Sequence, residues 1–362
     1  MYRLKTWLFA LGARLYEKLM FPAPVWLTRK PWYDLFWLLQ IPWLTQAVYV
    51  AAKLGIADLL KDGAKTAADL AELTQTHSPS LYRILRLLAG FGIFAEDKQG
   101  RFRLTPHARA LLSDAPDSMR AWAVFSGERS LSAAGVMLAS IRSGQNAYQV
   151  RFGESTWENL AKDPQAQACF NTAMDTFTEW QSGEILKAFP CGRFRRIVDV
   201  GGGLGRFLTK ILLANAHARG VLVDQAPMIA EAKARMQAAG VADRCEFVAG
   251  SFFEDVPAGG DAYVVKDVLH DWDDAHVVEI LRTCARAMDK AARLLVITGL
   301  INPANGVDRI MKLLDSQQLV QVGGGERTQA EFEALFQQAG LRLAGRHPTT
   351  IVGSVVLEVT KC

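Results

Sequence analysis

Short apolar runs alternate with longer amphipathic stretches over the second half of the chain. This alternation predicts a parallel sheet with helices on both of its faces. The last two apolar runs, LRLAGRH and SVVLEVTK, are joined by a turn, so we expect the sheet to finish with an antiparallel hairpin. The expected strands are 197–201, 220–224, 245–249, 261–268 and 293–299, and the expected helices are 205–216, 228–239 and 273–288.

Residues 65–110 combine helix-opening signals with one hairpin pattern. Thr66 and Asp69 form a capping-box pattern, and Ser78 followed by Pro79 is expected to cap and open a second helix. The segments IFAED and RFRLT, separated by KQG, predict a β-hairpin. Two helices, a turn and a hairpin outline a winged helix.

A winged-helix outline raises the hypothesis of DNA binding, and the charges argue against it. The would-be recognition helix offers only Arg83 and Arg86 as cations, whereas a DNA reader is expected to carry more basic and amide side chains there. The net charge of +4, from 41 basic and 37 acidic residues, is too small to indicate nucleic acid. A winged-helix regulator that senses a metabolite is therefore the weaker alternative.

The composition is that of a soluble globular protein. A length of 362 residues suggests about two domains, which we expect at 1–185, mainly helical, and at 186–362, containing the sheet. With 50% apolar and 22% charged residues, the chain is neither disordered, collagen-like nor a small disulfide scaffold. Five cysteines without CxxC spacing indicate free thiols in a reducing, cytoplasmic compartment and no structural zinc.

The N-terminal region needs separate consideration. Residues 1–34 are rich in aromatic, proline and basic residues, and they suit a peripheral membrane contact, an arm around a partner subunit, or a packing extension, the last being favoured. Residues 35–52 contain no charge and are long enough for a membrane span. Gln40 and Pro42 interrupt them, so we expect a buried or subunit-interface helix and no transmembrane span.

The segment DVGGGLG, from Asp199 to Gly205, lies at an expected strand-to-helix turn. Glycines there let the backbone approach a ligand closely, and the helix N-terminus can face a negative group. The spacing fits neither the dinucleotide fingerprint GxGxxG nor a P-loop. Asp224 ends the next expected strand and is placed to accept both hydroxyls of an adenosine ribose, with a simple loop carboxylate as the alternative. These residues favour a nucleoside-type cofactor.

The segment VLHDWDDAH follows the strand expected at 261–268. Ligands of open α/β sheets lie beyond the carboxyl ends of the strands, so His270 is placed where a general base would act. A structural histidine at a strand end fits the sequence equally well. The acidic residues invite a metal hypothesis, but helix capping by Asp273 and Asp274 is favoured and no metal is expected.

The segment GGGERT combines a glycine turn with a helix cap. Thr328 is expected to cap the following helix, which places Glu326 in a loop near the same end of the sheet as His270. A carboxylate opposite a catalytic histidine orients the imidazole and stabilises its protonated form. Glu326 is therefore a candidate partner of His270.

Taken together, these segments resemble the S-adenosylmethionine-dependent O-methyltransferases, in particular the plant caffeic-acid and flavonoid enzymes, the hydroxyindole O-methyltransferases and the bacterial polyketide or antibiotic O-methyltransferases. The resemblance covers about residues 40–360. It implies an α/β fold with a Rossmann-like class I methyltransferase sheet and a C-terminal antiparallel hairpin, preceded by a helical, winged-helix-like dimerisation domain. The segments that carry it are LYRILRLLAGFGIF, RFRLTPHARALL, WENL, FNTAM, DVGGGLG, GSFFE, LHDWDD and GGGERT.

The resemblance implies S-adenosylmethionine as the cofactor. Ser251 stands where the family usually has Asp, so a contact with the adenine is changed. The other implied contacts are Gly201 and Gly203 with the amino-acid portion, Asp224 with the ribose, Phe252 beside the adenine, and Lys266 at the family's cofactor-contact lysine.

The resemblance also implies catalytic roles for His270 as the base, Glu326 as its partner and Asp271 as the adjoining acidic residue. One departure concerns the fifth strand, which usually ends in a second glutamate near the catalytic histidine. Thr298 takes that place here, so the base is expected to be less fully supported.

The acceptor pocket is implied by a different set of residues. Phe170 and Met174, in FNTAM, match positions that line the pocket, and Gln318 lies in the substrate-facing stretch LLDSQQLVQV. Because Gln317, Gln318 and Gln321 stand where relatives are more apolar, the acceptor is expected to be more polar than a simple phenylpropanoid.

The sequence therefore predicts a cytoplasmic, homodimeric, metal-independent O-methyltransferase. Its acceptor would be a hydroxyl, expected to be phenolic, of a small aromatic or polyketide-like metabolite, with no nucleic-acid partner. His270 would remove the hydroxyl proton as the oxygen attacks. The alternative within the same fold is hydroxylation, decarboxylation or C-methylation of a polycyclic aromatic.

Overall fold

The computed structural model describes residues 30–304 and 308–362, so the arm expected at residues 1–34 lies largely outside the described residues. The chain divides into two compact units, Met1–Glu128 and Arg129–Cys362. Each unit has its own hydrophobic core.

The first unit contains helices around a small antiparallel sheet of strand order β1-β3-β2. The expected capping box is confirmed, since Thr66 and Asp69 bond reciprocally at the start of α5. The expected cap of the next helix is one residue off, because His77 is the capping residue and Ser78 is already helical. The helices are α2 Pro31–Leu38, α3 Ile41–Lys53, α4 Ile56–Leu59, α5 Ala67–Thr74, α6 Ser78–Gly90, α7 Pro106–Arg109 and α8 Arg120–Phe125, and the strands are β1 Lys65–Thr66, β2 Phe94–Glu96 and β3 Arg101–Leu104.

The long uncharged run forms two helices rather than one. The chain breaks at Leu39 and Gln40 between α2 and α3, and Pro42 lies in the first turn of α3, where it costs no helical hydrogen bond. The expectation of a buried helix is confirmed for the second half, where Ala47, Ala51 and Ala52 enter the core, while the alternative of a subunit-interface helix stays a prediction for the exposed first half. By length and composition, residues 31–53 suffice to cross a membrane, and 17% of their apolar window is buried.

The second unit contains a seven-stranded sheet of order β6-β5-β4-β7-β8-β10-β9. Strands β4 to β8 are parallel, and β10 runs antiparallel to β8 and β9, so the predicted hairpin is confirmed. The helices are α9 Leu131–Ala134, α10 Met137–Ser143, α11 Ala147–Phe152, α12 Thr156–Lys162, α13 Pro164–Ala188, α14 Arg206–Ala214, α15 Ala226–Ala238, α16 Asp274–Ala287, α17 Arg309–Gln321 and α18 Gln329–Gln338. The strands are β4 Arg196–Val200, β5 Arg219–Asp224, β6 Cys245–Ala249, β7 Ala262–Lys266, β8 Arg293–Gly299, β9 Leu341–Pro348 and β10 Ser354–Lys361.

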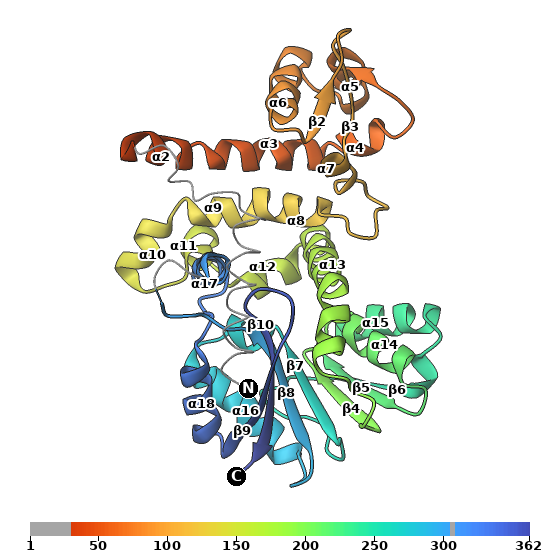
Figure 1. Cartoon of the computed structure of the whole chain (residues 1–362), viewed down its shortest axis with the longest axis vertical. Helices are drawn as coiled ribbons and strands as arrows, with labels where there is room; N and C mark the ends of the chain where they lie inside the picture. The colour runs from red at the N-terminus through yellow and green to blue at the C-terminus, as the bar shows by residue number, and fades with distance from the viewer. Residues whose placement is uncertain (1–29, 305–307) are drawn as a thin grey trace, which may run out of the picture. The chain divides into compact units, whose positions relative to one another are not determined.

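Helices cover both faces of this sheet. One core cluster joins the sheet to α16 and α18, and the other joins it to α13, α14 and α15 (Figure 1). Strand residues are accordingly apolar on both sides, as a buried parallel sheet requires. One strand is shorter than expected: β7 ends at Lys266, because Asp267 adopts a left-handed backbone (φ 52°) that turns the chain.

The division into units does not coincide with the boundary expected at residue 185. Helices α9 to α13 belong to the second unit, where α13 packs on α14 and α11 packs on α17. Contacts within one chain do not show which residues join two chains, so a dimerisation function for residues 1–185 stays a prediction.

Candidate active site

The carboxyl ends of four parallel strands bring the sequence motifs to one edge of the sheet. Strand β4 lies between β5 and β7, so the chain order reverses at this point. Ligands of open α/β sheets bind at such a switch point. Around it lie Gly201 after β4, Asp224 at the end of β5, Phe252 after β6 and Lys266 at the end of β7.

The glycine turn leaves open space at this edge. Gly201 and Gly203 have φ angles of 70° and 57°, which favour glycine. A Cβ atom on Gly201 would lie 2.9 Å from Val268 Cγ2, whereas one on Gly203 would meet nothing within 4 Å. The turn therefore packs tightly at its start and is open at Gly203, as a cradle for a ligand would be.

Asp224 ties this turn to the next strand. Its Oδ2 accepts the Gly203 N–H at 2.8 Å and its Oδ1 accepts the Gln225 N–H at 2.7 Å. Burial raises the pKa of Asp224, while these two N–H groups oppose the rise. A simple loop carboxylate would be exposed, so this partly buried carboxylate suits a pair of ribose hydroxyls.

A second carboxylate lies directly beneath the turn. Asp199 is buried, and burial raises its pKa to about 7 against the attraction of Lys266. A Cβ atom on Gly202 would lie 2.7 Å from Asp199 Oδ2, and this oxygen has no hydrogen-bond partner among the described residues. The orphaned oxygen and the space at Gly203 both fit a polar ligand over the turn.

Aromatic side chains form one wall of the cradle. The Phe252 ring lies 4.9 Å from that of Phe253 and 6.2 Å from that of Trp272, and it borders Gly201. Ser251 accepts the Phe253 N–H at 3.3 Å and so supports the turn that holds the wall. A flat apolar surface of this kind suits a purine base.

Lys266 connects the sheet edge to α13. Its Nζ lies 2.6 Å from Asp267 Oδ2 and 3.3 Å from Thr178 Oγ1, and its side chain is almost fully buried. Thr178 is one helical turn after Met174, so both side chains lie on the same face of α13. Phe170 lies one turn before Met174 and contacts Trp157 edge-on at 5.8 Å.

His270 lies in a 3₁₀ turn, Leu269–Asp271, just beyond β7. Its Nδ1 is 2.9 Å from Glu326 Oε1, and its Nε2 is 3.6 Å from Asp271 Oδ1. An ionised carboxylate can only accept, so the proton on this side belongs to Nδ1. In the neutral ring Nε2 is then the free base, and the side chain keeps 16% of its surface exposed.

The surrounding charges change the pKa values of this cluster. Burial lowers the pKa of His270, but the hydrogen bond to Glu326 and the charges of Asp271, Glu326 and Asp267 outweigh it and raise the pKa to about 9. Burial raises the pKa of Asp271 to about 7 against the attraction of His270. The protonated imidazole is therefore strongly stabilised, even with Thr298 at the end of β8.

Arg327 locks the histidine turn to the loop that carries Glu326. Its guanidinium donates to the carbonyls of Leu269 at 3.0 Å and Trp272 at 2.7 Å, and to Asp274 Oδ1 at 2.8 Å. The Glu326 N–H in turn donates to Asp315 Oδ1 of α17 at 2.9 Å. The distance between the two catalytic candidates is therefore held by polar contacts on both sides.

Glycine at position 324 is required by the same contact. A Cβ atom there would lie 2.1 Å from the His270 carbonyl oxygen and 2.6 Å from the Trp272 nitrogen. The loop backbone thus rests directly on the backbone of the histidine turn.

Helix α17 places the third acceptor candidate nearby. Gln318 is one turn after Asp315 on α17, so it lies on the face that reaches the Glu326 loop. Gln321, by contrast, is buried and donates to Ser130 at 3.0 Å. It therefore joins α17 to the start of α9.

The acidic residues after His270 cap a helix, as expected. Asp273 accepts the His276 N–H at 3.0 Å at the start of α16, and Asp274 pairs with Arg327. Within residues 30–304 and 308–362, no three His, Cys, Asp or Glu side chains gather as a metal site.

Several residues of the site region gave no motif signal. Thr178 accepts from Lys266, 88 residues later, and Asp315 accepts the N–H of Glu326, 11 residues later. Asp175 of α13 forms ion pairs with Arg206 at the start of α14 and with Arg235 of α15. It therefore links α13 to the two helices that flank the glycine turn. The spacing of residues in the sequence gives no signal for these contacts, which are visible in the three-dimensional structure.

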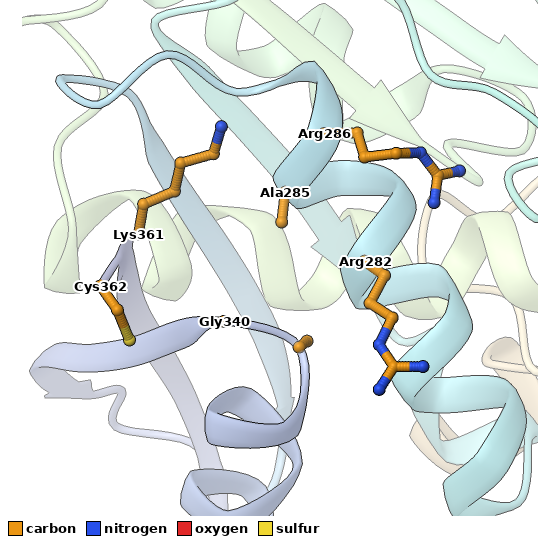
Figure 2. A pocket seen from close by; sticks show the side chains of 7 residues that line it. Arg282, Ala285, Arg286, Gly340, Lys361 and Cys362 are labelled. Atoms are coloured by element: carbon orange, nitrogen blue, oxygen red, sulfur yellow. The ribbon is translucent and has the colours of Figure 1, made fainter.

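A pocket of about 490 Å³ lies at the opposite edge of the sheet (Figure 2). It is lined by Arg282 and Arg286 of α16 on one side and by Lys361 at the chain end on the other. All three cations donate to backbone carbonyls, those of Gln338, Glu254 and Met288. The motif residues lie away from this pocket.

Family models match both parts of the chain. The model of an O-methyltransferase dimerisation domain matches residues 37–114, and that of an O-methyltransferase domain matches residues 136–342. The second range includes every candidate site residue described above.

Individual relatives match over most of their length. A phenazine O-methyltransferase of Lysobacter antibioticus is 41% identical over 314 residues, 87% of this chain and 92% of that protein. An aclacinomycin 10-hydroxylase of Streptomyces purpurascens is 36% identical over 304 residues, 82% of this chain and 81% of that protein. A crystal structure of an O-methyltransferase from neocarzinostatin biosynthesis, in complex with S-adenosylmethionine and 2-hydroxy-5-methyl naphthoic acid, has a TM-score of 0.78 at 36% identity and covers 88% of this chain and 96% of that chain.

Proposed function

Because the chain belongs to the family of S-adenosylmethionine-dependent O-methyltransferases, we propose that His270 is its general base and that a phenolic hydroxyl of a small aromatic metabolite is its acceptor. The enzyme uses S-adenosylmethionine as its cofactor. The observation that carries the proposal is the 2.9 Å contact between His270 Nδ1 and Glu326, which leaves Nε2 as the basic nitrogen of the neutral ring.

The proposed reaction is a proton removal coupled to methyl transfer. Bound S-adenosylmethionine supplies an electrophilic methyl group on a sulfonium sulfur. His270 Nε2 takes the proton of the acceptor hydroxyl, and Glu326 stabilises the positive imidazolium that results. Asp271, beside Nε2, adds a second negative charge to the same end of the ring.

The residues around the glycine turn are proposed to hold the cofactor. Asp224 would accept the ribose hydroxyls, Phe252 would lie along the adenine, and Lys266 would contact the cofactor. The turn at Gly201 and Gly203 would lie against the amino-acid portion. Each assignment is supported by a feature of the cradle, in turn a partly buried carboxylate, a flat ring, a buried cation and open space.

The acceptor is proposed to be an aromatic molecule with additional polar groups. The relatives named above act, by their names, on a phenazine and on an aclacinomycin, and the solved relative binds a hydroxynaphthoic acid. Phe170 and Met174 supply apolar surface, and Gln318 supplies an amide that can bond to a second polar group. Holding the oxygen in line with the methyl carbon would account for much of the rate.

Hydroxylation by the same fold is the second candidate, because one relative is a hydroxylase. The two reactions differ in their products. A panel of hydroxyphenazines, hydroxynaphthoic acids and catechols is incubated with S-adenosylmethionine carrying a labelled methyl group. Mass spectrometry that finds the label in an O-methyl product supports the proposal. A product that gains oxygen without the label would support hydroxylation instead.

The assembly and location are proposed on the same basis. The chain has a dimerisation domain at residues 37–114, and we infer that two copies form a homodimer in which this region helps to close the pocket. A cytoplasmic location fits a biosynthetic enzyme with five free cysteines. Peripheral contact of the N-terminal arm with a membrane also stays a prediction.

A further inference from the structure

Helix α13 takes part in both halves of the proposed site. Phe170 and Met174 of this helix are assigned to the acceptor, and Thr178 contacts Lys266 at the cofactor edge of the sheet. Helix α14 begins at Arg206, immediately after the glycine turn that is assigned to the cofactor. Helices α13, α14 and α15 lie together on one side of the sheet (Figure 1). A link between α13 and the start of α14 would therefore join the acceptor site to the cofactor site.

Arg206 forms such a link with its whole guanidinium group. Its Nε donates to Asp175 Oδ1 at 2.6 Å, and its Nη2 donates to Asp175 Oδ2. Its Nη1 donates to Glu179 Oε2 at 2.8 Å. Asp175 and Glu179 are one helical turn apart on α13, so both carboxylates lie on the same face of that helix. Two parallel bonds to one carboxylate fix the orientation of the guanidinium, which a single contact does not do.

Two further cations extend the link along the helices that flank the glycine turn. Lys210 Nζ of α14 lies 2.6 Å from Glu179 Oε1, and Arg235 Nη1 of α15 lies 3.0 Å from Asp175 Oδ2. The Asp175 side chain is 10% exposed, so two arginines compensate a nearly buried charge. Isolated surface ion pairs contribute little, whereas a bidentate pair within a network holds its partners in a defined geometry. We call Asp175, Glu179 and Arg206 the ion-pair cluster.

The ion-pair cluster lies in the part of α13 that carries the acceptor residues. The apolar core shared with α14 takes Ile185 from α13, with Leu186 packed against it, near the C-terminal end of the helix. Asp175 lies more than two turns earlier and directly follows Met174. Consecutive helical residues point about 100° apart, so the faces that hold these two side chains adjoin. Apolar packing therefore anchors the end of α13, whereas the ion pairs connect its acceptor-lining part to α14.

We propose that Asp175, Glu179 and Arg206 are positioning residues that couple the cofactor site to the acceptor site. A cofactor on the glycine turn orders the start of α14, and the ion-pair cluster transmits this order to the part of α13 that carries Phe170 and Met174. Because coupling between two sites is reciprocal, the acceptor strengthens cofactor binding by the same factor. This coupling rests on the proposed placement of the cofactor at the glycine turn and of the acceptor at α13.

Hydrogen exchange of the full chain with saturating S-adenosylhomocysteine tests the coupling without an identified acceptor. In the wild-type protein, the ligand should slow amide exchange both at the glycine turn with α14, residues 199–214, and in the acceptor-lining part of α13, residues 164–178. We expect slowing in α13 of about fivefold or more, the lower end for coupled sites. In Arg206→Met, the slowing at 199–214 should remain, and that in α13 should fall below about twofold.

Further variants separate coupling from a loss of folding. Asp175→Asn keeps the shape of the side chain and removes the charge from the α13 side, so it should lose the same protection. Arg206→Lys keeps the charge without the two parallel bonds and should restore part of the protection. Lys187→Met is the matched control, since Lys187 pairs at 2.6 Å with Glu184 of the same helix but its side chain is 75% exposed. This control should leave the protection of both segments unchanged.

The possible outcomes separate the coupling from the proposed function. Protection of α13 that persists in both Arg206→Met and Asp175→Asn would overturn the coupling and assign the transmission to the contact between Lys266 and Thr178. Faster exchange of α13 without ligand, with unchanged slowing by the ligand, would show a purely structural role and also overturn it. A wild-type protein protected only at the glycine turn would refute the coupling and support the cofactor site. Protection of neither segment would contradict the cofactor site itself.

Discussion

At the scale of single residues, the two ring nitrogens of His270 have different surroundings. Nδ1 is 2.9 Å from the buried carboxylate of Glu326, and Nε2 is 3.6 Å from Asp271 Oδ1. A ring held in this way has a defined tautomer, because the ionised Glu326 can only accept a hydrogen bond from it. In the neutral ring, Nε2 is then a base with a fixed direction.

Replacing His270 should therefore affect chemistry and not cofactor binding. We expect His270→Ala and His270→Gln to lower kcat by about 10²–10⁴-fold, the usual effect of losing a general base. Calorimetry should give nearly unchanged affinity for S-adenosylmethionine. Near-wild-type turnover of His270→Ala on the true acceptor would show that the histidine removes no proton.

Glu326 should set the pH range in which the reaction rate rises, because it raises the pKa of His270. Since only neutral His270 can take a proton, kcat/KM is expected to rise with pH until the free enzyme passes the pKa of about 9. Glu326→Gln removes the charge and hydrogen bond that raise this pKa, so the limb should move to lower pH. A limb that stays in place, measured over the same buffers, would assign the titration to another group.

Asp224 carries the prediction for the cofactor. Its two oxygens accept backbone N–H groups at the sheet edge, where they can exchange these partners for ribose hydroxyls. Asp224→Ala should weaken binding of S-adenosylmethionine by about 1.5–3 kcal/mol, the scale of lost charge-assisted hydrogen bonds. Unchanged affinity in calorimetry would contradict the ribose role.

At the scale of elements, two loops more than fifty residues apart form the catalytic pair together. Arg327 binds the carbonyls of the histidine turn, and Gly324 lies against its backbone. Neither loop by itself fixes the position of His270 relative to Glu326. The contact between them sets the distance from His270 to Glu326.

A methyl group at position 324 should separate these loops. Its Cβ would lie 2.1 Å from a backbone oxygen, which cannot rotate away as a side chain can. We expect Gly324→Ala to lower kcat at least about tenfold, because misplacement of about 1 Å is costly in a positioned reaction. Gly183→Ala is the control, since a Cβ there meets nothing within 4 Å. Steady-state kinetics showing equal kcat for both variants would contradict the contact.

At the scale of the whole molecule, ionisable groups of the site bind protons in the folded protein that they would release in the unfolded chain. The pKa of His270 is raised to about 9, and those of Asp271 and Asp199 are raised to about 7. The folded protein therefore binds more protons than the unfolded chain between pH 5 and 9. The contribution of His270 is fully present below its unfolded pKa of about 6.5 and is lost as pH rises through about 9.

The cofactor-free protein should consequently lose stability as pH rises. Each extra proton held by the folded state lowers the free energy of unfolding by about 1.4 kcal/mol per pH unit. Urea unfolding at about pH 5.5, 7 and 8.5 measures the slope. His270→Gln should flatten it most above pH 7. Stability that increases over this range would contradict the raised pKa values.

Some features of this protein follow from the sequence by itself. The alternation of apolar runs, the caps at Thr66 and Thr328, and the glycine turn after β4 depend on a few neighbouring residues, so local physics decides them. The placement of His270 and Asp224 also follows, because parallel strands bring their carboxyl ends to one edge.

Other features were decided only by the tertiary structure. Arg327 and Thr178 join elements that are distant in the sequence, and no local pattern distinguishes such a partner from a solvated side chain. The end of β7 at Lys266 depends on a single left-handed residue, and the exposure of α2 depends on which half of a uniformly apolar run enters the core. The pattern of apolar and polar residues predicts which side of an element is buried, whereas tertiary packing decides which residues each side chain contacts.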